Sequence, residues 1–206
     1  TIGLGCDTQV FARKTTSNSE EKRELGIAPD ETVFCYVGKI APEKGVHLIV
    51  DAAELVSHER KDFKVILVGQ ARGQYHGELI NRIRDAGLEH HFVFVPPVPN
   101  RELSRYYSIS DAGVWPTQCS LTMIEAMACG VPVVMSSESG AAERVRNGID
   151  GFLYTEGDVR DLATRMLTMF NADVRGAMSR AAVESAKEQD WRLIVARFLN
   201  LYQEGR

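Results

Sequence analysis

Several familiar signatures are missing from this sequence. The four cysteines (Cys6, Cys35, Cys119 and Cys129) form no CxxC pair, and the five histidines have no metal-ligand spacing. Neither HExxH nor Gly-x-Ser-x-Gly occurs. These absences argue against a zinc site, a disulfide framework and a serine hydrolase. Cys35 and Cys129 have apolar neighbours and are expected in the core, whereas Cys119 lies in a polar stretch.

Long apolar runs and an excess of basic residues are also missing. No run is long enough to span a membrane, and no signal peptide is present. The net charge of −4 argues against a nucleic-acid binder held by bulk electrostatics. With 206 residues, 44 % of them apolar, the chain is long enough for one domain. Because the sequence opens without Met, we expect part of a longer protein. We expect that protein to be cytoplasmic, with any membrane contact made through the missing part.

From residue 32 onward, apolar β-rich stretches alternate with segments of helical periodicity. Strands are expected at Thr32–Val37, Phe63–Val68, Phe92–Val95, Ala112–Trp115, Val131–Met135 and Phe152–Tyr154. Helices are expected at Glu20–Leu25, Val46–Leu55, Glu78–Asp85, Arg101–Ile109, near Ala141–Arg146, at Asp158–Phe170 and Asp173–Glu188, and from a cap at Asp190 to Tyr202. This alternation predicts an α/β domain, a doubly wound Rossmann-like parallel sheet with helices on both faces. In such sheets, ligands bind beyond the carboxyl ends of the strands.

The segment from Trp115 to Ser136 organises the chain. It indicates a buried strand, a polar loop over Thr117–Ser120, a helix and a second strand. Apolar residues of the helix, such as Leu121 and Ile124, have the spacing of one buried face. The helix would therefore begin at the carboxyl edge of the sheet.

A helix that begins at this edge suits an anion. Its unpaired N–H groups and its dipole, roughly half a positive charge, face the ligand. Glu125, one turn into the helix, is near enough to accept hydrogen bonds from sugar hydroxyls. The same residues fit a capping box equally well, with Thr122 as the cap and Glu125 folding back onto it. This segment alone does not decide between the two interpretations.

The loop after the first strand carries two lysines between Gly38 and Gly45. Gly38 would let a ligand approach the backbone, and Lys39 and Lys44 would supply charges for phosphate oxygens. The Lys-Ser/Thr ending of a Walker loop is missing. A charged surface turn explains this loop equally well.

The loop after the third strand, Pro96–Asn100, is rigid because three of its residues are prolines. Its remaining backbone N–H and C=O groups suit the edge of a nucleotide base. The alternative is a stiff connection in which Asn100 caps the next helix. Tyr106 and Tyr107 are expected to be core and surface aromatics rather than a stacking platform.

Taken together, these residues resemble the C-terminal, donor-binding half of a GT-B-type retaining glycosyltransferase of family 4, the glycosyl transferases group 1. The most specific match is the run Glu125-Ala-Met-Ala-Cys-Gly-Val-Pro-Val133. The other matching segments are Gly5-Cys6-Asp7 with Phe11, Tyr36–Lys39, Pro42–Gly45, Gly140 with Glu143, Asn147-Gly148 with Gly151–Leu153, and Asp190-Trp191 with Leu201-Tyr202.

The resemblance covers nearly the whole chain and implies its organisation. Residues 1–30 would be a lead-in and interdomain hinge, and 31–188 a Rossmann-like nucleotide-sugar-binding domain. Residues 189–206 would form a C-terminal helix that packs toward a missing N-terminal domain.

The resemblance also implies a role for each matching position. Lys39 and Lys44 would hold the donor diphosphate and stabilise it as it leaves, and Glu125 would bind the ribose hydroxyls. The other nucleotide-binding positions would be Gly38, the backbone amides near Leu121 and Thr122, and Pro97, Val98 and Asn100 beside the base. The donor sugar would face Thr117, Gln118, Cys119 and Ser120. No metal or other cofactor is implied, because the nucleotide-diphosphate sugar is a substrate.

One motif departs from the family pattern. The family usually has a second glutamate eight positions before Glu125, and this sequence has Thr117 there. The usual Gly-Phe-Gly that follows is replaced by Gln118-Cys119-Ser120. The resemblance therefore assigns neither a carboxylate that recognises the sugar nor a particular donor.

We expect a glycosyltransferase of the hexosyltransferase type that acts in polysaccharide or glycan biosynthesis and retains anomeric configuration. Its acceptor would be held by the missing N-terminal domain, so the isolated chain would bind nucleotide weakly and turn over little. One alternative is a non-catalytic nucleotide-sugar-binding scaffold. Another is a GT-B-like epimerase, which would need acid/base carboxylates that the loop 117–120 lacks.

Overall fold

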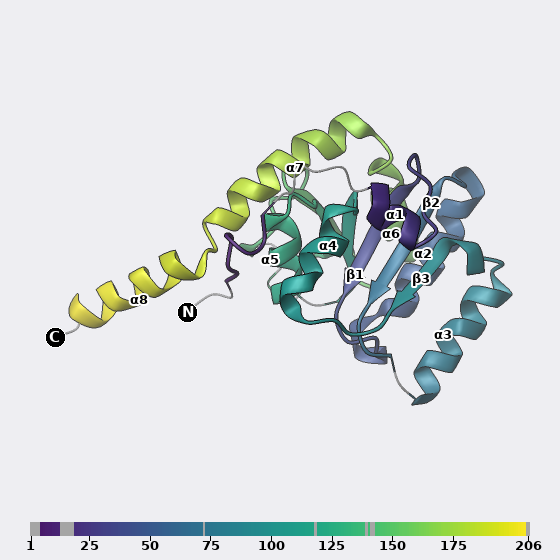
Figure 1. Cartoon of the computed structure of the whole chain (residues 1–206), viewed down its shortest axis with the longest axis horizontal. Coiled ribbons are helices and arrows are strands. Elements are labelled where there is room, and N and C mark those ends of the chain that lie inside the picture. Colours follow the sequence, from purple (N-terminus) through teal and green to yellow (C-terminus); the bar gives the residue numbers. More distant parts are fainter. Residues whose placement is uncertain are drawn as a thin grey trace.

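The computed structural model describes residues 5–12, 19–71, 73–117, 119–138, 140 and 143–204, with side chains to residue 200. These residues form a six-stranded parallel sheet in the order β3-β2-β1-β4-β5-β6 (Figure 1). The strands are β1 (Thr32–Val37), β2 (Phe63–Val68), β3 (Phe92–Val95), β4 (Ala112–Trp115), β5 (Val133–Ser136) and β6 (Gly151–Tyr154). The predicted doubly wound Rossmann-like α/β fold is confirmed. Strand order reverses between β1 and β4, so the loops after these two strands flank the crevice where such folds bind ligands.

The central strands are buried along their length, as their unbroken apolar sequences predict. Two strand starts differ from the prediction, and β6 begins at Gly151, one residue before the expected Phe152. β5 begins at Val133 instead of Val131, because Pro132 has no N–H to donate to the sheet. The carbonyl of Pro132 instead accepts a hydrogen bond from Gly113 N–H at 2.9 Å.

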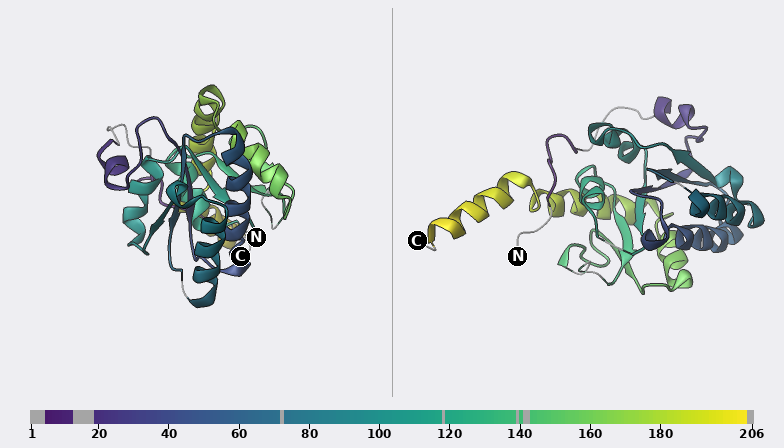
Figure 2. Two further views of the ribbon diagram at one scale, coloured as in Figure 1. Left: turned by 90° about the vertical axis from the view of Figure 1, so that its right-hand side faces the viewer. Right: turned by 90° about the horizontal axis from the view of Figure 1, so that it is seen from below.

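Helices cover both faces of the sheet, as Figure 2 shows edge-on. On one face lie α2 (Val46–Glu59), α3 (Gly73–Asp85) and α6 (Val159–Thr168), with α2 packed on α6. On the other lie α4 (Leu103–Ser108) and α5 (Leu121–Ala128), with α7 (Ala172–Lys187) packed on α5. The remaining described helical elements are α1 (Ser19–Glu24), α8 (Trp191–Glu204) and three short 3₁₀ turns, Pro42–Lys44, Glu89–His91 and Asn100–Glu102. The helix expected near Ala141–Arg146 falls partly outside the described residues, because Ala141 and Ala142 are not among them, and its described end, Val145 and Arg146, is not helical.

The burial of α5 corrects the expectation of a single apolar face. Every residue from Met123 to Ala128 is buried, whereas Leu121, placed on that face by its spacing, is 38 % exposed. α5 lies between the sheet and α7, so it is enclosed on all sides beyond its first turn. Apart from Glu125, the residues of this buried stretch are apolar, which suits a helix in such a position.

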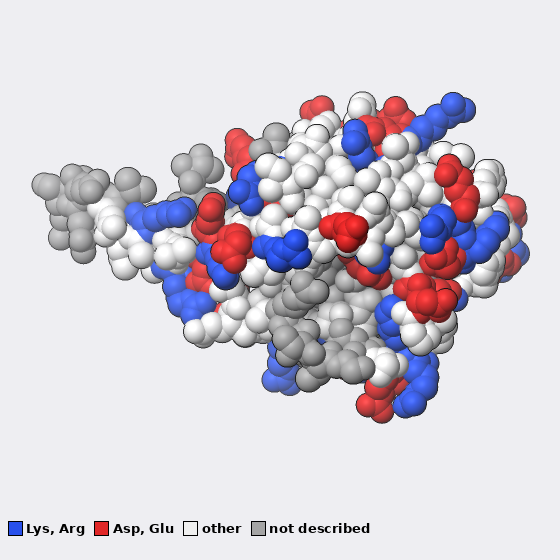
Figure 3. Space-filling model, turned by 90° about the horizontal axis from the view of Figure 1, so that it is seen from above, with Lys and Arg blue, Asp and Glu red and all other residues white. Residues whose placement is uncertain are grey.

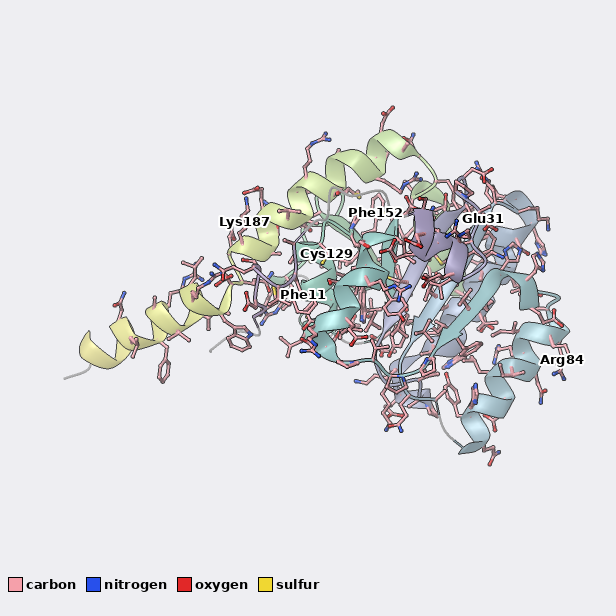
Figure 4. The ribbon with its side chains drawn as sticks, viewed as in Figure 1. Phe11, Glu31, Arg84, Cys129, Phe152 and Lys187 are labelled. Atoms are coloured by element: carbon pink, nitrogen blue, oxygen red, sulfur yellow. The ribbon has the colours of Figure 1, made fainter. Side chains whose placement is uncertain are left out.

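The N-terminal segment lies against the start of α8, although the two are far apart in sequence. Cys6 N–H donates to the Gln189 carbonyl, and Trp191 N–H donates to the Cys6 carbonyl, both at 3.0 Å. The carboxylate of Asp190 accepts from Arg192 N–H at 2.8 Å, so the predicted cap of the last helix is confirmed. Phe11, labelled in Figure 4, is buried, and its ring stands edge-on to that of Tyr107 with centroids 6.1 Å apart.

α8 projects away from the body of the domain (Figure 1). Five of its large apolar side chains are about half exposed, namely Trp191, Leu193, Val195, Phe198 and Leu199. No helix in the described part of the chain is both long enough and apolar enough to cross a membrane. On the face shown in Figure 3, acidic and basic side chains of the described residues are interspersed.

Candidate functional site

A cavity of about 280 Å³ opens at the carboxyl ends of β1 and β4, where strand order reverses. Its lining comes from the end of β1 and the loop after it, the end of β4, and the first turn of α5. The lining residues are Tyr36, Val37, Gly38, Lys39, Lys44, Trp115, Pro116, Thr117, Ser120, Leu121 and Thr122. The structure therefore brings together seven of the predicted site residues, Gly38, Lys39, Lys44, Thr117, Ser120, Leu121 and Thr122.

The two lysines reach the cavity from a short, well-defined loop. The 3₁₀ turn Pro42–Lys44 ends at Gly45, whose φ of 65° is left-handed, and α2 begins there. A Cβ at Gly45 would lie 2.7 Å from the Thr117 methyl group, so the lysine loop and the loop after β4 are in tight contact. The Thr117 hydroxyl also donates to the Glu43 carbonyl at 3.2 Å.

The charge of Lys39 on this loop is available to an anion. Lys39 Nζ lies 3.0 Å from Glu43 Oε1, and both side chains are more than half exposed. The hydrogen bond from Lys39 is the main reason that the pKa of Glu43 is lowered. An exposed ion pair of this kind contributes little net stability, so a phosphate can compete with Glu43 for the lysine. The loop is thus a charged surface turn that also forms one wall of a cavity.

The opposite wall is the start of α5. Ser120 is the N-cap residue, but its hydroxyl makes no capping bond and lies 2.8 Å from the Thr122 hydroxyl. The hydroxyl of Thr122 donates in turn to the Val37 carbonyl at 2.7 Å. This hydrogen bond joins the start of α5 to the end of β1. The first-turn amides and the positive end of the helix dipole therefore lie at the cavity.

The capping-box interpretation is wrong. The carboxylate of Glu125 does not fold back onto the helix start. Its Oε1 accepts from Asn100 Nδ2 at 2.9 Å, and its Oε2 lies 3.4 Å from the Tyr107 hydroxyl. Glu125 is only 5 % exposed, and burial raises its pKa, while the hydrogen bonds from Asn100 and Tyr107 oppose that rise. The carboxylate is held in place beside the cavity and is not part of its lining.

The loop after β3, which was predicted to border the base, does not line the cavity. Pro97 is exposed, Val98 packs partly on the core, and neither they nor Asn100 line the cavity. Asn100 is not a cap either. It is the first residue of the 3₁₀ turn, and Glu102 is the N-cap of α4. The side chain of Asn100 is instead directed to Glu125.

The loop predicted to face the donor sugar is described in part. Thr117 and Ser120 line the cavity, Cys119 packs partly on the core, and Gln118 lies outside the described residues. Burial raises the pKa of the Cys119 thiol, and the nearby charge of Arg144 lowers it by less. Cys119 is therefore held as a neutral thiol. In the described part of the chain, no three His, Cys, Asp or Glu side chains converge on a metal position.

Sequence reasoning missed two aromatic residues of the site. Trp115 forms part of the cavity wall, and its indole N–H donates to Val37 and to Thr122. A Cβ at Gly113 would lie 2.3 Å from the Trp115 ring, so the ring needs a glycine at this position. A glycine inside a strand often marks the close approach of another group, and Gly113 could have indicated the position of Trp115. Tyr107, expected on the core or the surface, is 1 % exposed and contacts Glu125.

Comparisons with known proteins identify the family and the fold of this chain. The family model for glycosyl transferases group 1 matches residues 17–189. The D-inositol 3-phosphate glycosyltransferase of Thermobispora bispora is 29 % identical over 99 % of this chain and 50 % of its own length. The D-inositol 3-phosphate glycosyltransferase 2 of Catenulispora acidiphila is 31 % identical over 100 % of this chain and 50 % of its own length. The chain spans about half the length of the curated relatives it matches.

Solved structures show the same fold. Anabaena HepE, crystallised with UDP and glucose, has a TM-score of 0.88 at 24 % identity over 97 % of this chain and 55 % of its own. The C-terminal domain of a glycosyl transferase group 1 family protein (LpcC) from Francisella tularensis has a TM-score of 0.79 at 19 % identity. That match covers 90 % of this chain and 98 % of the Francisella domain. This chain has the fold of the C-terminal half of a GT-B glycosyltransferase, and it belongs to the glycosyl transferases group 1 family.

Proposed function

We propose that this chain is the donor-binding half of a retaining glycosyltransferase that uses a nucleoside-diphosphate sugar. The observation that carries the proposal is the meeting of Lys39, Lys44 and the start of α5 around one cavity. Point charges and free helix amides together are the usual protein environment of a phosphate group. HepE, whose fold is the same, binds UDP, so UDP is the first nucleotide to test.

The mechanism follows from charge development. As the bond between the sugar and the diphosphate breaks, negative charge grows on the leaving phosphate oxygens. Lys39, Lys44 and the first-turn amides of α5 stabilise that charge, each well-placed contact contributing on the order of 3 kcal/mol in the transition state. These groups supply the positive charge from the protein itself, so we propose a reaction that needs no metal ion.

The ribose is assigned to Glu125. A carboxylate has acceptor capacity for two adjacent hydroxyl groups, and this one is already desolvated and oriented. Asn100 now occupies Oε1, so the ribose would share or replace that bond. Pro97 and Val98 are proposed to lie beside the base, because their loop leads directly to Asn100.

The sugar would face a neutral loop. Thr117 and Ser120 line the cavity, and its lining, among the residues that the structure describes, includes no acidic side chain. Sugar recognition through hydroxyl and backbone groups is therefore part of the proposal.

The acceptor is assigned to a preceding domain of the same protein, because the chain spans half the length of its relatives. We propose that residues 1–30 form the connection and that 189–206 pack against that domain. The exposed apolar side chains of α8, such as Trp191 and Phe198, support this role, since apolar surface of this kind favours burial. A cytoplasmic location suits the four free cysteines and is proposed on that basis.

Two other functions make different predictions. An epimerase needs acid/base carboxylates beside the sugar, and the residues that line the cavity include none. A scaffold that does not use this cavity would not depend on the lysines or on Glu125 for nucleotide affinity, and mutagenesis with calorimetry tests for it. A scaffold that binds the nucleotide sugar in this cavity would depend on them, and the measurement of sugar transfer separates it from the transferase.

The test is titration of the chain with UDP, GDP and ADP, using wild type, Lys44→Ala and Glu125→Ala. Loss of one charged contact to phosphate is expected to weaken binding about tenfold or more. Lys61→Ala is the matched control, because Lys61 is an exposed lysine just before β2, at the opposite edge of the sheet. Unchanged affinity in both site variants, for every nucleotide that binds, would favour a scaffold that does not use this cavity.

Activity is measured separately. The 206-residue chain alone is expected to turn over little or no donor, because the acceptor groups lie elsewhere. A protein that includes the preceding domain is expected to transfer sugar with retained anomeric configuration, determined by NMR of the product. Appreciable transfer by the chain alone would refute this division of labour.

A further inference from the structure

One tyrosine joins the two halves of the proposed nucleotide site. The hydroxyl of Tyr107, on α4, donates to the Thr122 carbonyl at 3.0 Å and lies 3.4 Å from Glu125 Oε2. Thr122 belongs to the helix start that faces the diphosphate, and Glu125 is the proposed ribose ligand. A single hydroxyl group therefore contacts both.

The bonds around Tyr107 extend across the sheet edge. Asn100, from the loop after β3, holds the other oxygen of Glu125 at 2.9 Å. Thr122 is bound through its hydroxyl to Val37 at the end of β1 and to the indole of Trp115 in β4. A backbone carbonyl at the end of β1, the indole of Trp115 at the end of β4 and the amide of Asn100 after β3 thus hold Thr122 and Glu125 of α5 in place.

Tyr107 itself is well anchored. It is 1 % exposed, and Phe11 packs edge-on against its ring. Burial raises the pKa of Tyr107 well above its usual value, and the nearby Glu125 raises it further. The hydroxyl therefore keeps its single proton, which it shares between the Thr122 carbonyl and Glu125 Oε2.

We propose that Tyr107 is a positioning residue that holds Glu125 in register with the diphosphate-binding turn of α5, so that one rigid unit recognises ribose and phosphate together. This inference rests on the proposed function. Tyr107 does not line the cavity, so its effect is exerted through Glu125 and Thr122.

The neighbouring residue provides a matched control. Tyr106 is also on α4 and is 9 % exposed, yet its hydroxyl makes no hydrogen bond to any other residue that the structure describes. Tyr107→Phe and Tyr106→Phe each remove one oxygen atom from a buried ring on the same helix. A difference between them reports the contacts of the hydroxyl rather than the loss of a polar atom.

The experiment compares UDP with 2′-deoxy-UDP by titration calorimetry on the 206-residue chain. Wild type is expected to prefer UDP, because the 2′-hydroxyl contacts Glu125. Tyr107→Phe is expected to lower that preference about fivefold, which corresponds to about 1 kcal/mol, the contribution of one hydrogen bond. Tyr106→Phe is expected to leave the preference unchanged. A purely structural role for Tyr107 would weaken both nucleotides equally.

The pH dependence of UDP binding gives a second readout. Glu125 accepts from two hydroxyls only when it is ionised, and the hydrogen bond from Tyr107 lowers the pKa of Glu125. The titratable groups that interact with Glu125 among the described residues are Tyr107 and Cys6, and burial raises the pKa of the Cys6 thiol to about 12. UDP affinity is expected to fall as the pH drops through the pKa of Glu125, and this decrease is the acidic limb of the pH profile. Removing the Tyr107 hydroxyl should therefore move the acidic limb to higher pH. Tyr106→Phe should not.

The outcomes separate this inference from the proposed function. If Glu125→Ala weakens UDP binding but Tyr107→Phe changes neither the UDP preference nor the acidic limb, the inference is overturned and the function stands. If wild type binds no nucleotide, the function fails and the inference with it. A lower preference and a shifted limb in Tyr107→Phe alone would establish the positioning role.

Discussion

Replacing Gly69 with alanine should separate steric cost from backbone strain at the edge of the cavity. Gly69 follows β2, Gly38 follows β1, and the Gly38 N–H donates to the Val68 carbonyl at 3.0 Å. A Cβ on Gly69 would lie 1.8 Å from the Gly38 carbonyl oxygen, whereas real Cβ contacts essentially never fall below 3.0 Å. The obstacle is backbone, so no side-chain rotation relieves it.

The expected magnitude has two parts. Gly69 has a φ of +148°, which L side chains rarely adopt, and such strain costs about 1–3 kcal/mol. Forcing the two strand ends apart adds a further 1–3 kcal/mol or so, as in an overpacked core. Gly69→Ala should therefore lower the free energy of unfolding by about 2–6 kcal/mol, a large fraction of the stability of a typical domain.

Gly87→Ala is the control. Gly87 also has a left-handed φ of +67°, but a Cβ there meets nothing within 4 Å. Only the backbone cost of about 1–2 kcal/mol applies. Urea denaturation followed by circular dichroism measures both variants. Destabilisation of Gly69→Ala no larger than that of Gly87→Ala would refute the argument that these strand ends are pressed together.

Three further predictions concern the rest of the chain. Asp190 is 5 % exposed, and the hydrogen bonds that it accepts from Arg192 and Thr8 lower its pKa. Its ionised carboxylate therefore stabilises the folded chain fully above the ordinary aspartate pKa of about 3.9. This stabilisation is lost as the pH falls through the lower pKa of the folded state. Asp190→Asn should therefore be less stable than wild type at pH 7, with the gap narrowing in thermal unfolding below about pH 4. A chelator should leave UDP affinity unchanged in calorimetry, because lysines and helix amides supply the charge, and a lost affinity restored by Mg²⁺ would contradict this. Phe198→Ser should leave the unfolding temperature of the chain nearly unchanged, because Phe198 is 46 % exposed. The same substitution should destabilise a protein that includes the preceding domain, and an equal effect in both would count against a role of α8 at that interface.

The fold was predictable because strands of a sheet that is covered on both faces appear in the sequence as unbroken apolar runs. Strands such as Thr32–Val37 are unbroken apolar runs, and the turns between elements carry glycine or proline. The loops after β1 and β4 could be chosen as ligand loops because parallel strands end at one edge of the sheet. That reasoning correctly brought Lys39, Lys44 and Thr122 to one cavity.

Side-chain partners were less predictable. Thr122 and Glu125 have the spacing of a capping box, yet Glu125 bonds to Asn100 and Tyr107, which come from two other elements. Spacing along the sequence identifies side chains that are neighbours on one helix. It does not identify hydrogen-bond partners that come from other elements of the fold. For the same reason, Leu121 was assigned to a buried face, although the first turn of α5 opens to the cavity.

The contact between Cys6 and the residues around Asp190 sets a limit on how this domain can be shortened. A version that starts after residue 12 would keep every strand of the sheet, yet it would uncover the ring of Tyr107 by removing Phe11. It would also free the Gln189 carbonyl and the Trp191 N–H, which Cys6 now satisfies. The eight residues 5–12 are therefore an integral part of the folded unit, and any excised domain should retain them.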